Sequence, residues 1–337
     1  MPDTKIKAAV IGAGAWGTTL AMILAENNHQ VVVWAHDEQI ADAINNRHEN
    51  TVLFPGIALP RSIAATTDLE AAARDADLIV LVVASKFFSE TVRRLIPFLN
   101  ERTILISATK GLDPETKKRT AELLEDVLPD ELHEKTGILS GPNIAREIAA
   151  RKPATTVIAS RNHYTARRAQ EYFSTPYFRV YTNTDVTGTE IGGTLKNIIA
   201  IAAGIIDGLG LGDNTRSALM VRALVEIIRF GNRFGARTET FYGLAGMGDL
   251  ITTCSSVMSR NHHVGEHLAK GRTLKEILAD MTAVAEGVET TRLVHEIAKR
   301  DGIEMPVTEQ VYAVLFEDKP VKQAIFDLMT RDLKAEH

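Results

Sequence analysis

Three glycines near the N-terminus have the spacing G-x-G-x-x-G, which can hold the pyrophosphate of a dinucleotide. An apolar run at 8–11 precedes them and predicts a buried strand, and residues 18–25 favour a helix. In this context Gly12 permits a tight turn, Gly14 lets the backbone approach a pyrophosphate, and Gly17 lets the helix pack on the strand. Glycines alone could form a plain turn. The strand–turn–helix order instead favours a dinucleotide site at the positive end of the helix.

A lysine that enters the most apolar segment of the chain is a candidate for proton transfer. Lys196 is followed almost at once by Ile198, Ile199 and Ile201, in a predicted helix at 194–209 that is apolar nearly all round. Most lysines on helices are solvated, and that is the alternative here. An ammonium group held among apolar side chains could instead give or take a proton during catalysis.

Two further segments carry polar side chains that suit a small anionic substrate. A glycine-rich run at 243–256 contains one acid, Asp249; its sequence favours a helix N-cap, and the alternative is a carboxylate that orients a catalytic lysine. Ser259 is a suitable N-cap that would place Arg260 and Asn261 in a first helical turn, where free N–H groups attract anions. An arginine fork there suits a phosphate; the alternative is a solvated helix start.

The composition excludes several classes of protein. A net charge of −5 gives no electrostatic reason to expect nucleic acid or an anionic membrane as a partner. The only cysteine, Cys254, rules out an intrachain disulfide and fits a reducing cytoplasm. We expect neither a secretory peptide nor a membrane span, because the longest apolar run is too short. The neighbouring His262 and His263 predict no metal site, since no carboxylate or cysteine lies at ligand spacing around them.

The order of predicted elements divides the chain in two. Strand-like runs at 8–11, 31–34, 78–83, 103–107, 137–140 and 155–159 alternate with helical runs such as 85–99 and 117–128. From Gly188 onward the pattern is helical, with helices expected at 194–209, 217–234, 260–269, 274–278, 290–300 and 307–316. We therefore predict an α/β Rossmann-type doubly wound sheet over residues 1–188, followed by an all-α domain over 189–337.

Many separate motifs, in order, resemble the NAD(P)-dependent glycerol-3-phosphate dehydrogenases, particularly the bacterial type. The resemblance covers essentially the whole chain. It rests on Gly12–Gly17 with Trp16, Thr109–Leu112, Leu139–Ala145, Gly192–Asn197, Leu211–Arg216, Gly243–Ser256, Ser259–Asn261 and Ala285–Gly287. It implies a C-terminal domain like that of the 6-phosphogluconate dehydrogenase group, a cytoplasmic location and a homodimer that does not span a membrane.

The resemblance also implies an activity: reversible reduction of dihydroxyacetone phosphate by NADPH or NADH to sn-glycerol 3-phosphate, supplying glycerophospholipid synthesis. Lys196 matches the lysine that protonates the carbonyl oxygen, Asp249 the acid bonded to it, and Lys110 a second lysine near substrate and cofactor. The other implied substrate contacts are Gly141, Asn143, Thr253, Ser259, Arg260 and Asn261. The implied cofactor contacts are Gly12, Gly14, Ala15, Trp16, Gly17, His36, Lys110, Ala145, Arg260, Val284 and Glu286.

Two residues depart from the family pattern. Ala84 stands where the family commonly has proline, directly after the predicted strand that ends at Val83. Asn143 stands where many bacterial members have serine or threonine, a change that could alter a hydrogen bond to the substrate.

Two other functions are compatible with parts of the sequence. A dehydrogenase of the same architecture that acts on a β-hydroxyacid would bind a carboxylate, and the Arg260–Asn261 pair argues against it. A redox-sensing regulator would bind the dinucleotide without turnover, and it would need neither Lys196 nor Asp249. Mixing the protein with NADPH and dihydroxyacetone phosphate while following absorbance at 340 nm separates the classes.

We predict a preference for NADPH over NADH. The second strand ends Val33-Trp34-Ala35-His36-Asp37, so a histidine stands where NAD-specific domains usually have an acid that binds the ribose hydroxyls. A histidine can donate a hydrogen bond to a 2′-phosphate, whereas a carboxylate would repel it. The rival is that Asp37 turns inward and selects NADH. The check is kcat/KM for both cofactors in wild type and in His36→Asp; a wild-type preference for NADH, or undiminished use of NADPH by the variant, would contradict the prediction.

Overall fold

The computed structural model describes residues 5–281, 285–333, 335 and 336 and divides into two compact units, residues 1–190 and 191–337. The first unit contains one eight-stranded sheet. Its strands are β1 (Lys7–Ile11), β2 (Gln30–Trp34), β3 (Ile63–Thr66), β4 (Leu78–Leu81), β5 (Ile104–Ser107), β6 (Thr136–Ser140), β7 (Ala154–Ala159) and β8 (Phe178–Asn183). Their spatial order is β3-β2-β1-β4-β5-β6-β7-β8, and every pair is parallel except β6 with β7. The first six follow the Rossmann order, which confirms the predicted fold class.

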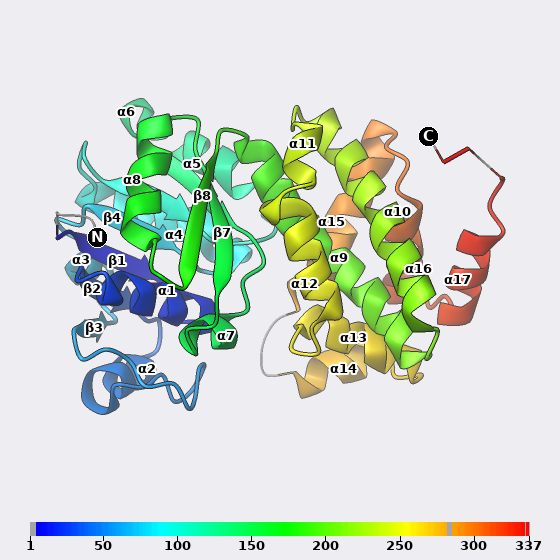
Figure 1. Ribbon diagram of the computed structural model, residues 1–337, viewed down its shortest axis with the longest axis horizontal. Helices are drawn as coiled ribbons and strands as arrows, with labels where there is room; N and C mark the ends of the chain where they lie inside the picture. Colours follow the sequence, from blue (N-terminus) through cyan, green and yellow to red (C-terminus); the bar gives the residue numbers. More distant parts are fainter. Residues whose placement is uncertain (1–4, 282–284, 334, 337) are drawn as a thin grey trace. The chain divides into compact units, whose positions relative to one another are not determined.

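Helices cover both faces of this sheet (Figure 1). They are α1 (Ala15–Glu26), α2 (Glu38–Asp42), α3 (Leu69–Ala73), α4 (Phe88–Leu95), α5 (Thr120–Val127), α6 (Asp130–His133), α7 (Ala145–Ala149) and α8 (His163–Phe173). Because strand side chains alternate, Val10 and Val80 face a core with α1, α7 and α8, while Ile11 and Leu81 face a core with α3, α4 and α5. The central strands are therefore apolar throughout, as expected for a sheet covered on both sides.

The second unit is helical over its described residues, as predicted. Its helices are α9 (Val186–Gly208), whose first residues belong to the first unit, α10 (Gly212–Arg233), α11 (Thr238–Phe241), α12 (Asp249–Ser255), α13 (Arg260–Ala269), α14 (Leu274–Asp280), α15 (Glu286–Asp301), α16 (Pro306–Phe316) and α17 (Val321–Met329). By length and composition, α9 alone among the described helices is apolar enough to cross a membrane, but 83% of its apolar window is buried inside the protein. It has the burial of a core helix.

Two predicted helices differ from the observed ones for local reasons. The run predicted as one helix at 85–99 is α4 flanked by short 3₁₀ turns, because Pro97 lacks the N–H that would continue an α-helix. The helix predicted from Lys117 begins only at Thr120, since Asp113 accepts hydrogen bonds from the backbone N–H groups of Glu115 and Thr116 and holds a turn there.

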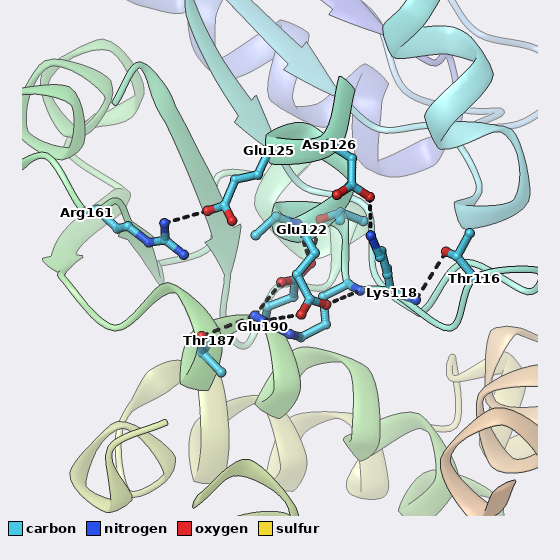
Figure 2. Close-up of polar contacts among 11 residues, drawn as sticks. Thr116, Lys118, Glu122, Glu125, Asp126, Arg161, Thr187 and Glu190 are labelled. Atoms are coloured by element: carbon cyan, nitrogen blue, oxygen red, sulfur yellow. Dashed lines mark hydrogen bonds and ion pairs between the residues drawn. The ribbon is translucent and has the colours of Figure 1, made fainter. Parts of the chain in front are cut away.

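A buried carboxylate from α9 supports the start of α5 (Figure 2). Glu190 accepts hydrogen bonds from Thr120 Oγ1 at 2.6 Å and from the Ala121 N–H at 3.1 Å, and it forms an ion pair with Arg119 at 3.4 Å. Arg119 also donates to Thr187 Oγ1. Burial raises the pKa of Glu190, although Arg119, Thr120 and the Ala121 N–H each lower it. The helix's own Glu122 caps only the Arg119 N–H, so the carboxylate of Glu190 satisfies a further backbone donor of the first turn from outside.

A second buried carboxylate does the same for α16. Glu226 on α10 accepts hydrogen bonds from the N–H groups of Val307, at 2.6 Å, and Thr308, at 3.2 Å. Burial raises the pKa of Glu226 to about 7, although these hydrogen bonds lower it. Between the ordinary value of about 4.3 and pH 7 the unfolded chain gives up this proton and the folded chain keeps it. This one group therefore makes the protein less stable as pH rises through that range.

We expect Glu226→Gln to remove this pH dependence. The variant also carries a destabilisation that does not depend on pH, because an amide nitrogen replaces one acceptor oxygen. Between pH 5 and 8 the wild type should lose about 2–3 kcal/mol of unfolding free energy relative to Glu226→Gln. Urea denaturation across this range is the measurement, with Glu309→Gln, an exposed glutamate of α16, as control. Curves for wild type and Glu226→Gln that run parallel with pH would contradict the assignment.

Candidate functional site

The glycine loop between β1 and α1 has a backbone that only glycine fits. Gly12 has φ +124°, and a Cβ there would lie 2.6 Å from the carbonyl oxygen of Val82. A Cβ on Gly17 would overlap the Gly12 carbonyl, so helix and turn are in direct contact. Gly14, the N-cap of α1, faces open space within 4 Å and lends α1 no side-chain cap. This open, uncapped helix start fits the pyrophosphate of a dinucleotide.

Asn50, which the sequence analysis did not single out, holds this loop in place. Its fully buried amide nitrogen donates to the Ala13 carbonyl at 2.7 Å and to Thr18 Oγ1 at 2.9 Å. Its oxygen accepts from the Leu53 N–H at 3.0 Å. The first two bonds link the segment after α2 to the glycine loop and to α1, and the third closes a local turn at Asn50. The predicted cofactor residues Ala15 and Trp16 form the first turn of α1, next to this support.

His36 and Asp37 follow β2 and are both exposed. The carboxylate of Asp37 accepts a hydrogen bond from the Gln39 N–H at 2.8 Å and so caps α2. The ring of His36 lies 6.2 Å from that of Trp34, measured between centroids. Asp37 is thus engaged by its own helix, and the ribose contact expected of His36 remains a prediction.

Lys110 lies on the turn after β5, at the carboxyl edge of the parallel strands. The turn is fixed by Thr109, whose hydroxyl donates to the Val83 carbonyl at 2.8 Å, and by Gly111, which has φ +115°. Ala84, the departure from the family's proline, has φ −61° and ψ 146°, values that proline also adopts. Alanine at position 84 therefore keeps the backbone dihedral angles that a proline would have there.

The third predicted loop of this unit lies between β6 and α7. Gly141 has φ +152°, and a Cβ there would lie 3.0 Å from Thr156 Cα. Asn143 donates to the Thr155 carbonyl at 3.0 Å and lies 2.9 Å from Thr156 Oγ1, so its amide binds β7. Ala145 opens α7, and its carbonyl lies 3.4 Å from Thr19 Oγ1 on α1. The substrate contact expected of Asn143 remains a prediction.

In the second unit, Lys196 and Asp249 form a buried ion pair. The Nζ atom of Lys196 lies 2.5 Å from Asp249 Oδ1 and 2.6 Å from Thr253 Oγ1. Both charged residues are less than a tenth exposed. Asp249 is the first residue of α12, whose N-cap is Gly248, so the N-cap interpretation of Asp249 is wrong. Thr253 stands four residues later on the same helix face, a spacing that could have revealed its contact with Lys196.

The predicted start of α13 is confirmed. Ser259 is the N-cap and accepts a hydrogen bond from the His262 N–H at 3.3 Å, which places Arg260 and Asn261 in the first turn. Arg260 is exposed and Asn261 is buried. The Asn261 side-chain oxygen accepts from the Gly287 N–H at 2.9 Å, at the start of α15. Glu286 is the first residue of α15, and Val284 lies outside the described residues.

Another charged cluster, also absent from the sequence predictions, joins α9, α10 and α13. Asp207 accepts from His262 Nε2 at 2.7 Å on one carboxylate oxygen and from Arg216, at 2.6 and 3.0 Å, on the other. Although burial opposes it, hydrogen bonds from His262 and Arg216 lower the pKa of Asp207. Nearby, burial raises the pKa of Cys254 to about 12, so this residue stays a thiol.

The first unit thus carries a glycine loop fit for a dinucleotide, and the second carries a buried ammonium–carboxylate pair and an exposed arginine at a helix start. Such features define a nicotinamide-dependent oxidoreductase that acts on a small substrate.

Comparison with known proteins gives the particular family. Residues 7–166 and 185–326 match the models for the N-terminus and the C-terminus of NAD-dependent glycerol-3-phosphate dehydrogenase. A glycerol-3-phosphate dehydrogenase [NAD(P)+] from Geobacter sp. (strain M21) is 47% identical over 98% of both chains. The chain belongs to the NAD-dependent glycerol-3-phosphate dehydrogenase family.

Solved structures agree with this assignment. The glycerol-3-phosphate dehydrogenase of Coxiella burnetii is 36% identical, with a TM-score of 0.91 over 97% of this chain and 99% of that one. The enzyme of Saccharomyces cerevisiae is 31% identical, with a TM-score of 0.83 over 97% of this chain and 100% of that one.

Proposed function

We propose that this oxidoreductase interconverts dihydroxyacetone phosphate and sn-glycerol 3-phosphate with NADPH or NADH, and that Lys196 is its proton donor. The observation that carries the proposal is the buried bond between Lys196 Nζ and Asp249 Oδ1 at 2.5 Å. Breaking up a buried ion pair costs several kcal/mol, so the Asp249 carboxylate holds the Lys196 amine in a fixed position. The product serves glycerophospholipid synthesis.

Reduction of the ketone requires two electrons and one hydrogen at carbon, and one proton at oxygen. When bound, the nicotinamide supplies the hydride. Lys196 stabilises the negative charge that develops on the carbonyl oxygen and then transfers a proton to it; the reverse reaction returns the proton to the amine. Asp249 and Thr253 orient the Lys196 ammonium through bonds of 2.5 and 2.6 Å.

The substrate phosphate is assigned to the first turn of α13. Arg260 is exposed there beside the N-cap Ser259, and the helix start adds free backbone donors and a positive dipole end. Asn261 ties this turn to α15 through Gly287. We assign Lys110, Gly141 and Asn143 to further substrate contacts on the strength of the family motifs.

The cofactor is assigned to the loop of Gly12, Gly14 and Gly17, with its ribose end at His36. Ala15, Trp16, Lys110, Ala145, Arg260 and Glu286 complete the proposed contacts, together with Val284. The capping role of Asp37 supports NADPH as the preferred cofactor, because its carboxylate is held by the Gln39 N–H.

We also propose a homodimer that works in the cytoplasm. Val221 and Val225 on α10 are 55% and 36% exposed, and subunit interfaces bury apolar side chains of this kind. The single buried cysteine suits a reducing compartment. Sedimentation equilibrium that gives the monomer mass at micromolar concentration would contradict the dimer.

Lys196→Ala should fold, bind NADPH and lose most turnover, because loss of a general acid costs about 10²–10⁴ in rate. Removal of the amine strands the Asp249 carboxylate, so Lys196→Met with Asp249→Asn is a second variant without a buried charge. Single-turnover kinetics and NADPH fluorescence titration are the measurements, with the exposed Lys275→Ala as control. A fall in kcat of less than tenfold in Lys196→Ala would show that another group is the acid.

Arg260→Ala should weaken the use of dihydroxyacetone phosphate and hardly change the poor use of unphosphorylated dihydroxyacetone. A charge-assisted contact of this kind is worth about 1.5–3 kcal/mol, or about 10–150-fold in kcat/KM. The experiment compares kcat/KM on the two substrates in wild type, in Arg260→Ala and in Arg222→Ala, an exposed arginine of α10. Equal losses on both substrates would assign Arg260 to the fold or the cofactor.

A further inference from the structure

The cluster of Asp207, His262 and Arg216 has no part in the proton transfer, yet it is built from three helices. Asp207 is the penultimate residue of α9, Arg216 is in the second turn of α10, and His262 is the third residue of α13. His262 Nε2 lies 2.7 Å from Asp207 Oδ2, and its side chain is only 5% exposed. Arg216 occupies the other carboxylate oxygen with two donors. Each oxygen of Asp207 thus binds a different helix.

Glycines bring α13 directly onto the backbone of α9. A Cβ on Gly204 would overlap the carbonyl of His262, and one on Gly265 would overlap the carbonyl of Ile201. A Cβ on Gly208 would lie 2.6 Å from that of Ala269. Backbone contact of this kind sets the distance between the two helices and the faces that meet, and the Asp207–His262 bond adds a directional side-chain contact in the first turn of α13.

The other end of this contact lies beside Lys196. A Cβ on Gly287 would lie 2.6 Å from the Asn197 carbonyl and 2.8 Å from Asn261 Oδ1. The start of α13 is therefore near the residue that follows Lys196, and His262 is the next residue along from Asn261. The Asp207–His262 hydrogen bond therefore joins α9 to the residue directly after Arg260 and Asn261.

We propose that Asp207 and His262, braced by Arg216, form a positioning clamp that sets the rotation of α13 and so aims its first turn at the substrate phosphate. The inference rests on the proposed phosphate site at Arg260 and Asn261. His262 and Asp207 touch neither substrate nor cofactor in this account; they act through the helix that carries the phosphate donors. Without the clamp, the donors remain present but are displaced, and small displacements of binding groups cost affinity.

The test uses the ratio of kcat/KM on dihydroxyacetone phosphate to kcat/KM on dihydroxyacetone, which isolates the contribution of the phosphate. His262→Leu should lower this ratio about tenfold, through KM for dihydroxyacetone phosphate. Asp207→Asn keeps the side-chain shape and should do the same, so it serves as the test if His262→Leu does not fold. The double variant should lose no more than the larger single loss, because both changes break one contact.

Two variants serve as controls. His262→Gln places an amide donor within reach of Asp207 and should retain most of the ratio. His263→Leu alters the neighbouring exposed residue and should leave the ratio unchanged. A loss in His262→Leu that is equal on both substrates, or a loss as large in His262→Gln, would overturn the clamp and assign His262 to general stability.

Arg260→Ala in the same assay separates the two proposals. If Arg260→Ala lowers the ratio and His262→Leu and Asp207→Asn do not, the clamp is wrong and the phosphate site stands. If Arg260→Ala leaves the ratio unchanged, both fall.

Discussion

The second unit is organised around the need to keep one ammonium group charged inside an apolar helix. A buried lysine requires a carboxylate at hydrogen-bond distance, and Asp249 provides it from another helix. That contact requires α12 to approach α9 closely. Gly192, one turn before Lys196, makes the approach possible, since a Cβ there would overlap the Ala245 carbonyl. Gly246 allows the same chain to pass the backbone of Phe241. The glycine-rich sequence before Asp249 thus permits the close backbone approach that the ion pair requires.

A second theme is that several helices are capped by side chains from elsewhere in the chain. The N-cap residues of α5, α15 and α16 provide no side-chain cap. Glu190, Asn261 and Glu226 supply acceptors from 69, 26 and 81 positions away. Each bond satisfies a helix start and also fixes one helix against another, which a local cap cannot do. These three buried polar residues therefore hold helices in position as well as satisfying backbone donors.

Local patterns predicted most of the fold, and long-range contacts were the part that they could not reveal. The apolar run at 78–83 and the glycine loop at 12–17 are determined by neighbours in sequence, so strand, turn and helix could be predicted. The strands at Ile63–Thr66 and Phe178–Asn183 were missed because one is short and rich in alanine and the other half exposed. Local sequence alone favoured a cap at Asp249, because its partner lies 53 residues away, and only the family motifs pointed to Lys196. The partners of Asp207 and Asn50 are likewise distant or unmarked by any motif.

The only cysteine of the chain lies next to the ion pair in α12, and this gives the protein an intrinsic reporter of its own opening. Cys254 is fully buried, and burial raises its pKa to about 12, so a thiol reagent meets neither an accessible nor an ionised sulfur in the closed state. Reaction requires α12 to separate from its neighbours. The rate of labelling therefore measures how often the environment of Lys196 opens, and it does so without any substitution in the chain.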